Sequence, residues 1–73
     1  MKKLSDISLV SYLRCKGYKI GKIEKQKEKS IFLFDEDDKL ETEILKYYNH
    51  EAEIDPLKFS ETLRNLKSLA KQG

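Results

Sequence analysis

The side chains that most often carry chemistry are scarce in this chain. Its 73 residues include one cysteine, Cys15, and one histidine, His50, which lie far apart in the sequence. A cysteine–histidine pair could supply an activated thiolate. However, His50 stands at an expected helix end, where a histidine interacts favourably with the last carbonyl groups. We therefore expect no catalytic constellation and predict that the protein is not an enzyme.

The acidic run Asp35–Asp38 superficially suggests a metal site. It lacks the glycine and the twelve-residue spacing of a calcium-binding loop. Acidic residues are favourable in the first turn of a helix, which explains the run better. The chain also has no glycine-rich phosphate loop, because Gly17 and Gly21 are accounted for by a helix ending and a strand bulge. We expect no metal, no cofactor and no small-molecule substrate.

Basic and acidic residues are strongly segregated along the chain, although the formal net charge is only +2. Residues 1–15 carry +2, residues 16–29 carry +4, residues 35–55 carry −7 and residues 56–73 carry +3. The basic residues form two groups, one on an expected hairpin and one on the last helix. Their members are Lys19, Lys22, Lys25, Lys27 and Lys29 on the hairpin, and Arg64, Lys67 and Lys71 on the helix.

These two groups would form a footprint for phosphates if they adjoin in space. Arg64 is the most informative member, because its planar guanidinium suits bidentate pairing. Its partner could equally be an internal acid, Asp55 or Glu61. In the plainer alternative, the lysines are only solvated and the acids of the second helix neutralise them.

Aromatic side chains could stack on bases, as they do in proteins that bind single strands. Most of the seven occupy apolar helix stripes or strands, which favours core packing. Tyr12 is the exception, because it lies off the apolar arc of the first helix, which consists of Ile7, Leu9, Val10 and Leu13.

The elements that must position these groups follow from periodicity and capping. A first helix spans residues 5–16, with Ser5 or Asp6 as its N-cap, and Gly17 ends it in the left-handed conformation. Two strands follow, residues 18–23 with a bulge at Gly21 and residues 30–34, joined by a charged loop over residues 25–29.

Two further helices complete the pattern. Leu40, Ile44, Tyr47 and Tyr48 repeat as one apolar stripe, which ends near Asn49-His50. Asp55 at N-cap and Pro56 at the first helical position open the last helix. Phe59, Leu63, Leu66 and Ala70 form its inward stripe. The sequence thus predicts one α+β domain over residues 1–73, in the order helix, two-stranded antiparallel hairpin, helix, helix (αββαα).

The location follows by default. No apolar run resembles a secretion signal or reaches the roughly eighteen residues of a membrane span, and a lone cysteine makes no intramolecular disulfide. We expect a reduced, cytoplasmic location with no membrane contact.

With these elements placed, the chain resembles a family of small uncharacterised bacterial and phage proteins. The segments that carry the resemblance are residues 8–13, 16–18, 31–35, 48–49, 55–59 and 63–68. Most of them are core and capping positions, and packing does not fully explain Arg64-Asn65-Leu66-Lys67. The resemblance implies the fold and a mobile-element setting, and it implies no activity, ligand or site.

Two functions remain open at this point. The first is an accessory protein that binds nucleic acid through the eight basic residues, with little base-specific readout. The second is a protein-interaction module, such as a homodimer, an adaptor or a phage-encoded inhibitor. Its motivation is a surplus of apolar surface, from Ile31 and Leu33 opposite Phe32 and Phe34 and from the off-stripe residues Leu45 and Leu69, together with the acidic second helix.

Overall fold

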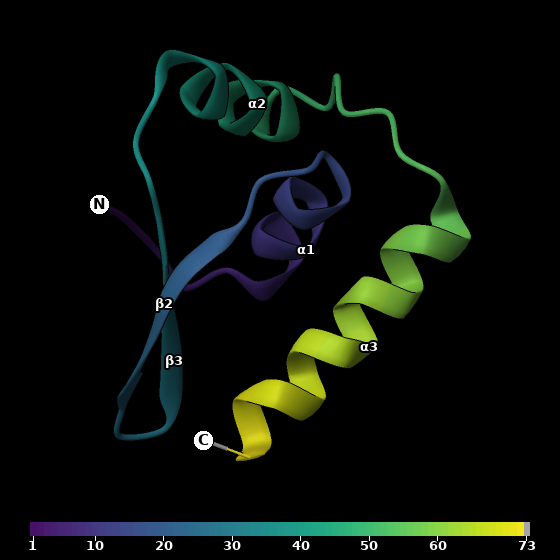
Figure 1. Ribbon diagram of the computed structural model, residues 1–73. Helices are drawn as coiled ribbons and strands as arrows, with labels where there is room; N and C mark the ends of the chain where they lie inside the picture. The colour runs from purple at the N-terminus through teal and green to yellow at the C-terminus, as the bar shows by residue number, and fades with distance from the viewer. Residues whose placement is uncertain (73) are drawn as a thin grey trace.

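Residues 1–72 are described by a computed structural model of the chain, which has three strands and three helices (Figure 1). The elements in chain order are β1 (Lys2–Leu4), α1 (Ile7–Cys15), β2 (Ile20–Gln26), β3 (Lys29–Phe34), α2 (Asp38–Tyr48) and α3 (Pro56–Gln72). The sheet is antiparallel with the strand order β1-β3-β2. The α+β class is confirmed. The predicted order αββαα is wrong, because the order is βαββαα with a three-stranded sheet.

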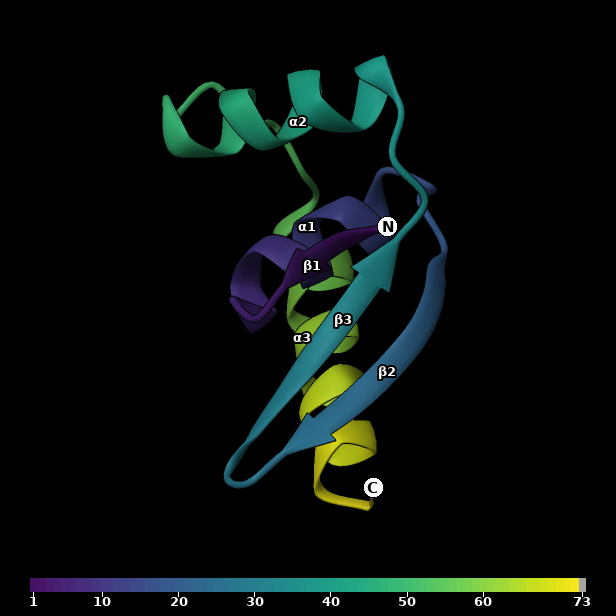
Figure 2. The same ribbon diagram turned by 90° about the vertical axis from the view of Figure 1, so that its left-hand side faces the viewer.

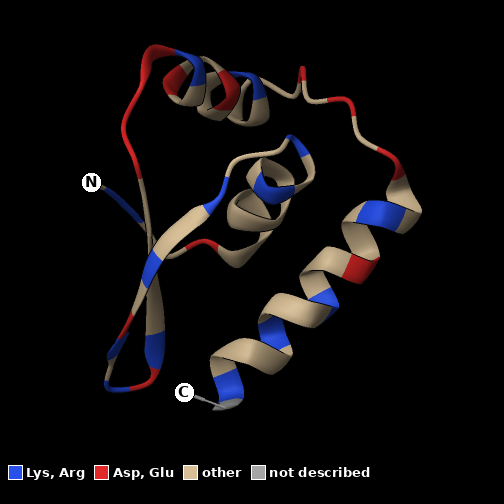
Figure 3. Ribbon diagram, in the orientation of Figure 1, with Lys and Arg blue, Asp and Glu red and all other residues tan. Residues whose placement is uncertain are grey.

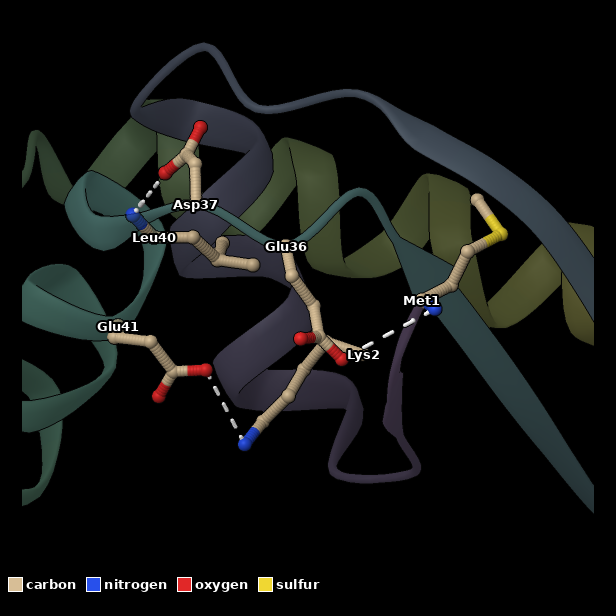
Figure 4. Close-up of polar contacts among 6 residues, drawn as sticks. All are labelled: Met1, Lys2, Glu36, Asp37, Leu40 and Glu41. Atoms are coloured by element: carbon tan, nitrogen blue, oxygen red, sulfur yellow. Dashed lines mark hydrogen bonds and ion pairs between the residues drawn. The ribbon is translucent and has the colours of Figure 1, made fainter.

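The strand missing from the prediction is β1, which pairs with the free edge of β3. Lys2 stands opposite Phe34 and Leu4 stands opposite Phe32. Contacts with α2 also hold this segment, since the Nζ of Lys2 lies 3.4 Å from an oxygen of Glu41 (Figure 4). A three-residue strand with two lysines has no periodicity of its own. Its position is fixed by a partner far away in the sequence, so local patterns could not reveal it.

The hairpin of β2 and β3 is longer than predicted. Its strands continue to Gln26 and from Lys29, so the turn consists of Lys27 and Glu28 rather than a five-residue loop. Lys27 adopts a left-handed φ of 48° to close this tight turn. Backbone pairing needs no apolar side chains, which is why a fully polar stretch extends the strands. The predicted bulge is confirmed at Gly21, where the register shifts between Ile20 and Lys22.

Local capping sets the ends of α1 as the sequence predicts. The carboxylate of Asp6, rather than Ser5, caps the helix and accepts from the backbone N–H of Ser8 at 3.0 Å. At the other end Gly17 has φ of 98°, and the N–H of Tyr18 donates to the carbonyl of Leu13 at 3.1 Å. This six-to-one bond is the signature of the Schellman ending.

The two later helices also begin at aspartate caps, of which the sequence predicts Asp55 but not Asp37. Asp37 accepts from the N–H of Leu40 at 2.6 Å, a bond drawn in Figure 4, so only part of the acidic run lies within α2. Asp55 accepts from the N–H of Leu57 at 3.0 Å, and Pro56 is the first residue of α3. These carboxylates satisfy N–H groups that have no partner within their helix.

The core lies between the sheet and the helices, and the helices cover only one face of the sheet. Phe32 and Phe34 on this inner face join a buried cluster with α1, α2 and Leu66 of α3. Figure 2 looks onto the other face, which no helix covers. There Ile31 and Leu33 are nevertheless buried, with 9% and 7% of their surface exposed. The predicted surplus of apolar surface on β3 is therefore small.

Two aromatic assignments need correction. Tyr12, expected to lie outside the core, is buried because α2 passes over that side of α1. The hydroxyl group of Tyr12 donates to Glu43 Oε1 at 2.6 Å. Tyr48, expected in the inward stripe of α2, is exposed near the end of that helix. Leu45 and Leu69 are exposed as predicted, and Leu57 is exposed as well.

Candidate nucleic-acid interface

The tip of the hairpin meets the C-terminal end of α3. The Nζ of Lys25 donates to the carbonyl oxygen of Ala70. A cavity of about 250 Å³ lies at this junction and includes both Lys25 and Lys71. The two basic groups that the sequence separates by some forty residues therefore adjoin in space.

The ammonium of Lys25 has a structural task in this arrangement. It lies against one of the last carbonyl groups of α3, where the helix dipole favours a positive charge. Lys25 thus connects the hairpin to α3, while its side chain remains exposed to solvent. Its positive charge still contributes to the potential at this end of the protein.

Arg64, Lys67 and Lys71 occupy one arc of α3 because residues three, four and seven apart share a helix face. Arg64 and Lys67 line a groove of about 230 Å³ together with Ser60 and Leu63. Since Lys71 reaches the cavity at the hairpin, this arc leads along α3 towards the hairpin tip. We call Lys25, Lys27, Lys29, Arg64, Lys67 and Lys71 the basic end of the molecule.

Two parts of the protein differ in their prevailing charge, although Lys and Arg also occur on α1, on α2 and near the N-terminus (Figure 3). Lys and Arg dominate the hairpin tip and the lower part of α3, whereas Asp and Glu dominate the start of α2 and the segment that joins α2 to α3. Glu28 in the turn is the acidic residue within the basic end. Such a separation produces an electrostatic field across the whole molecule, which can orient a charged partner during encounter.

The acidic residues in α2 and just before it form ion pairs with cations other than the hairpin lysines. Glu41 pairs with Lys2, and Glu43 pairs with Lys46 at 3.8 Å. Glu36 lies 4.0 Å from the backbone nitrogen of Met1, as Figure 4 shows. Within residues 1–72, none of the eight predicted basic residues forms an ion pair, and Arg64 has neither Asp55 nor Glu61 as a partner. Among residues 1–72, no acid of α2 pairs directly with a hairpin lysine, and the hairpin lysines are exposed to solvent, as in the plainer alternative.

Two of the eight predicted residues lie away from the basic end. Lys19 precedes β2, and its neighbour Ile20 pairs with Phe34 at the end of the hairpin opposite the turn. Lys22 stands opposite Leu33, so it lies on the uncovered face of the sheet near the bulge. The structure therefore places Lys25 beside Lys71 and leads from there to Lys67 and Arg64 along α3. Lys27 and Lys29 lie at the hairpin tip, where the strand register puts Lys29 on the same uncovered face as Lys22.

A family model described as a domain of unknown function (DUF5659) matches residues 2–72. The chain belongs to this family. Because the match runs over β1, the hairpin and all three helices, the basic end of this DUF5659 domain is built entirely from the matched residues. Neither the curated proteins nor the solved structures contain a match to the chain.

Sequence reasoning missed the polar neighbours of the basic end. Ser5, Ser30 and Glu28 line the same cavity as Lys25 and Lys71. Ser5 comes from the segment between β1 and α1, so only the tertiary fold of this DUF5659 domain brings it to the hairpin. No pattern in the sequence signals this proximity.

Within residues 1–72, no three His, Cys, Asp or Glu residues gather as metal ligands, and no helix combines the length and apolar character of a membrane span. Cys15 faces α3, where its thiol lies 3.5 Å from the hydroxyl oxygen of Thr62, whereas His50 ends α2 with a left-handed φ of 59°. These two residues belong to different parts of the fold.

Proposed function

We propose that this protein binds the phosphate backbone of a nucleic acid through its basic end, with little readout of base sequence. The observation that supports the proposal is the shared cavity of Lys25 and Lys71, because it places the tip of the hairpin beside the C-terminal end of the α3 stripe. Lys27, Lys29, Arg64, Lys67 and Lys71 are exposed and without an acidic partner among residues 1–72.

Charge alone supports binding to phosphates and does not support base recognition. Direct readout needs several side chains that reach base edges. The basic end consists mainly of lysines, which act as point charges, and its one guanidinium belongs to Arg64. The buried aromatic rings of Tyr12, Phe32 and Phe34 are not available for stacking on bases. We infer a binder of low sequence preference that acts without catalysis as an accessory protein.

The proposal also includes the biological origin and the cellular location of the protein. The resemblance of the core and capping residues to small bacterial and phage proteins supports a role in a bacterium or a mobile element. A nucleic-acid binder of this kind would act in the cytoplasm, in agreement with the expectation from the sequence. No cofactor or small molecule takes part in the proposed contact.

Fluorescence anisotropy with labelled oligonucleotides, single-stranded and duplex, tests the proposal at several salt concentrations. The logarithm of the association constant should fall linearly with the logarithm of the salt concentration, with a slope of about 0.9 for each duplex phosphate that is contacted. Four or five contacts would therefore give a slope of roughly 4. Absence of binding at about 50 mM salt would remove the proposal.

Charge reversal then locates the surface. Arg64→Glu and Lys67→Glu should each weaken binding to all sequences alike and lower the salt slope by about 1. Lys39→Glu is the matched control, because Lys39 is equally exposed but lies in the acidic region at the start of α2. An equal loss of binding in Lys39→Glu would mean that net charge, and not the basic end, governs the contact.

Protein interaction is the second candidate function, and the exposed leucines favour it. Leu57 and Leu69 on α3 and Leu45 on α2 are all large, apolar and open to solvent. They lie on two different helices, Leu45 on α2 and the other two on α3. If the folded protein binds no nucleic acid in the anisotropy experiment, protein interaction becomes the favoured function.

A further inference from the structure

We propose that two copies of this chain associate through the free edges of their β2 strands, to form one continuous six-stranded antiparallel sheet. The inference goes beyond the proposed nucleic-acid contact and does not depend on it. It starts from the strand order β1-β3-β2, which leaves β2 at one edge of the sheet. The edge runs over seven residues, Ile20–Gln26, and no helix lies beyond it in Figure 2.

An unpaired strand edge presents a row of backbone N–H and C=O groups that another strand can pair with. Many proteins protect such an edge with lysines or with a bulge. Here the bulge is confined to Gly21 at the start of the strand. The following residues, Lys22 to Gln26, keep a regular register with β3.

The charges on this edge complement those of a second copy. When two β2 strands pair about a twofold axis at Ile23, Lys22 of one copy stands opposite Glu24 of the other. The twofold axis repeats this pair, so two opposite-charge pairs form. Lys22 and Glu24 stand opposite Leu33 and Ile31 of β3, which puts both of them on the uncovered face of the sheet. Cross-strand pairs of opposite charge are stabilising, and like charges in such pairs are destabilising.

The same charges exclude the neighbouring registers. In a twofold antiparallel pair, directly opposite residues share a face, so the axis can move only by one whole residue. An axis at Lys22 would set Lys22 against itself, and an axis at Glu24 would set Glu24 against itself. Of these three registers, only the axis at Ile23 gives attraction, and it also brings the half-buried Ile23 side chains of both copies together on the inner face.

Glu24 supplies a second, independent observation. Its Oε1 is shielded from solvent and has no hydrogen-bond partner within residues 1–72. A buried carboxylate oxygen without a donor is costly, and such groups usually indicate a missing partner. Lys22 of the same chain does not pair with it. In the paired edge, the ammonium of Lys22 from the second copy would lie beside this carboxylate and compensate its charge.

Sedimentation equilibrium of the purified protein, from about 10 µM to about 1 mM and without nucleic acid, tests the proposal. The wild-type chain should form a dimer within this range. Lys22→Glu and Glu24→Lys each convert two attractive pairs into two repulsive ones, and each should weaken the dimer at least about tenfold. The two variants change the net charge in opposite directions, so a general charge effect cannot weaken both.

The double variant tests whether the charge pairing itself holds the two copies together. Lys22→Glu combined with Glu24→Lys restores opposite charges across the edge, and its dissociation constant should return to within about threefold of the wild-type value. Lys29→Glu is the control, because Lys29 is exposed on β3 and lies away from the free edge. A monomeric wild-type chain at every concentration, or a double variant no tighter than the single ones, would overturn the proposal.

Zero-length cross-linking of the wild-type protein gives a readout that needs no variant to fold. In a mixture of isotopically light and heavy chains, a carbodiimide should join Lys22 of one copy to Glu24 of the other, and mass spectrometry identifies the mixed-isotope peptide. Cross-links between copies that avoid both residues would place the interface elsewhere and refute the β2 pairing. Circular dichroism spectra of all variants confirm that they are folded.

Discussion

The hydroxyl group of Tyr12 joins α1 to α2, and Tyr12→Phe should destabilise the protein by about 2 kcal/mol. The hydroxyl donates to Glu43 Oε1 at 2.6 Å, and the Tyr12 side chain is only 1% exposed. A hydrogen bond to a charged group contributes about 1.5–3 kcal/mol. The side chain of Glu43 keeps 19% exposure and a contact with Lys46, so its carboxylate does not become isolated in the variant. This argues for the lower half of the range.

A loss of this size is large for a small domain. A chain of 73 residues has a free energy of unfolding of roughly 4–11 kcal/mol. Urea unfolding followed by circular dichroism would measure the change, and the slope with denaturant should stay constant because the ring remains in the core. A double-mutant cycle with Glu43→Gln isolates the pair. A Tyr12→Phe change below about 0.5 kcal/mol, or no coupling in the cycle, would refute the reasoning.

The same contact predicts a pH dependence. Burial of the phenol, the hydrogen bond to Glu43 and the nearby negative charge of Glu43 raise the pKa of Tyr12 above its ordinary value of 10.0. The folded protein therefore keeps the phenol proton at pH values where the unfolded chain releases it. The stabilisation is complete below pH 10 and declines as the pH rises above it.

Tyrosine substitutions separate the contributions to this pH dependence. Burial also raises the pKa values of Tyr18 and Tyr47, so the decline in the free energy of unfolding above pH 10 should be shallower, and not absent, in Tyr12→Phe. Unfolding curves recorded between about pH 8 and pH 11 would show it. Equal slopes for the wild-type and Tyr12→Phe proteins would contradict the assignment.

Two further predictions concern backbone geometry and helix docking, and both are measured by denaturant unfolding. Gly17→Ala should cost about 1–2 kcal/mol, because φ of 98° is unfavourable for any residue with a Cβ although the space around it is open. Gly21→Ala should change the stability by no more than about 0.5 kcal/mol, because its Cβ meets chiefly the mobile end of Met1. Leu66→Ala should cost about 2–3 kcal/mol, since Leu66 is the buried leucine that docks α3, whereas the exposed Leu69→Ala should cost less than about 0.5 kcal/mol.

The ends of the helices could be predicted because they depend on short-range backbone chemistry. The caps are Asp6, Asp37 and Asp55, and each accepts from an N–H group two or three residues later in the chain. Their effect therefore depends only on the local sequence. Gly17 is similar, because a left-handed residue after an apolar helix ends that helix wherever it lies in the fold. These features set the ends of the helices without reference to distant residues.

The candidate site could be predicted only in part. The chain shows which residues are basic and that Arg64, Lys67 and Lys71 share an arc of α3. It does not show that Lys25 is engaged by the carbonyl of Ala70 or that Lys19 lies at the other end of the hairpin. Side-chain partners across some forty residues depend on how α3 packs on α1, and no local period encodes that packing.

The sequence by itself determined the α+β class, the helix caps, the bulge and the separation of charge along the chain, because each of these arises from neighbours within a few residues. The tertiary structure alone decided that β1 joins β3, that Tyr12 is buried under α2, and that the hairpin tip meets α3. These outcomes depend on which segments of the chain, distant in the sequence, come into contact in the folded protein. The physical reason is that hydrogen bonding along a strand edge and burial of a ring are both satisfied by partners from anywhere in the chain.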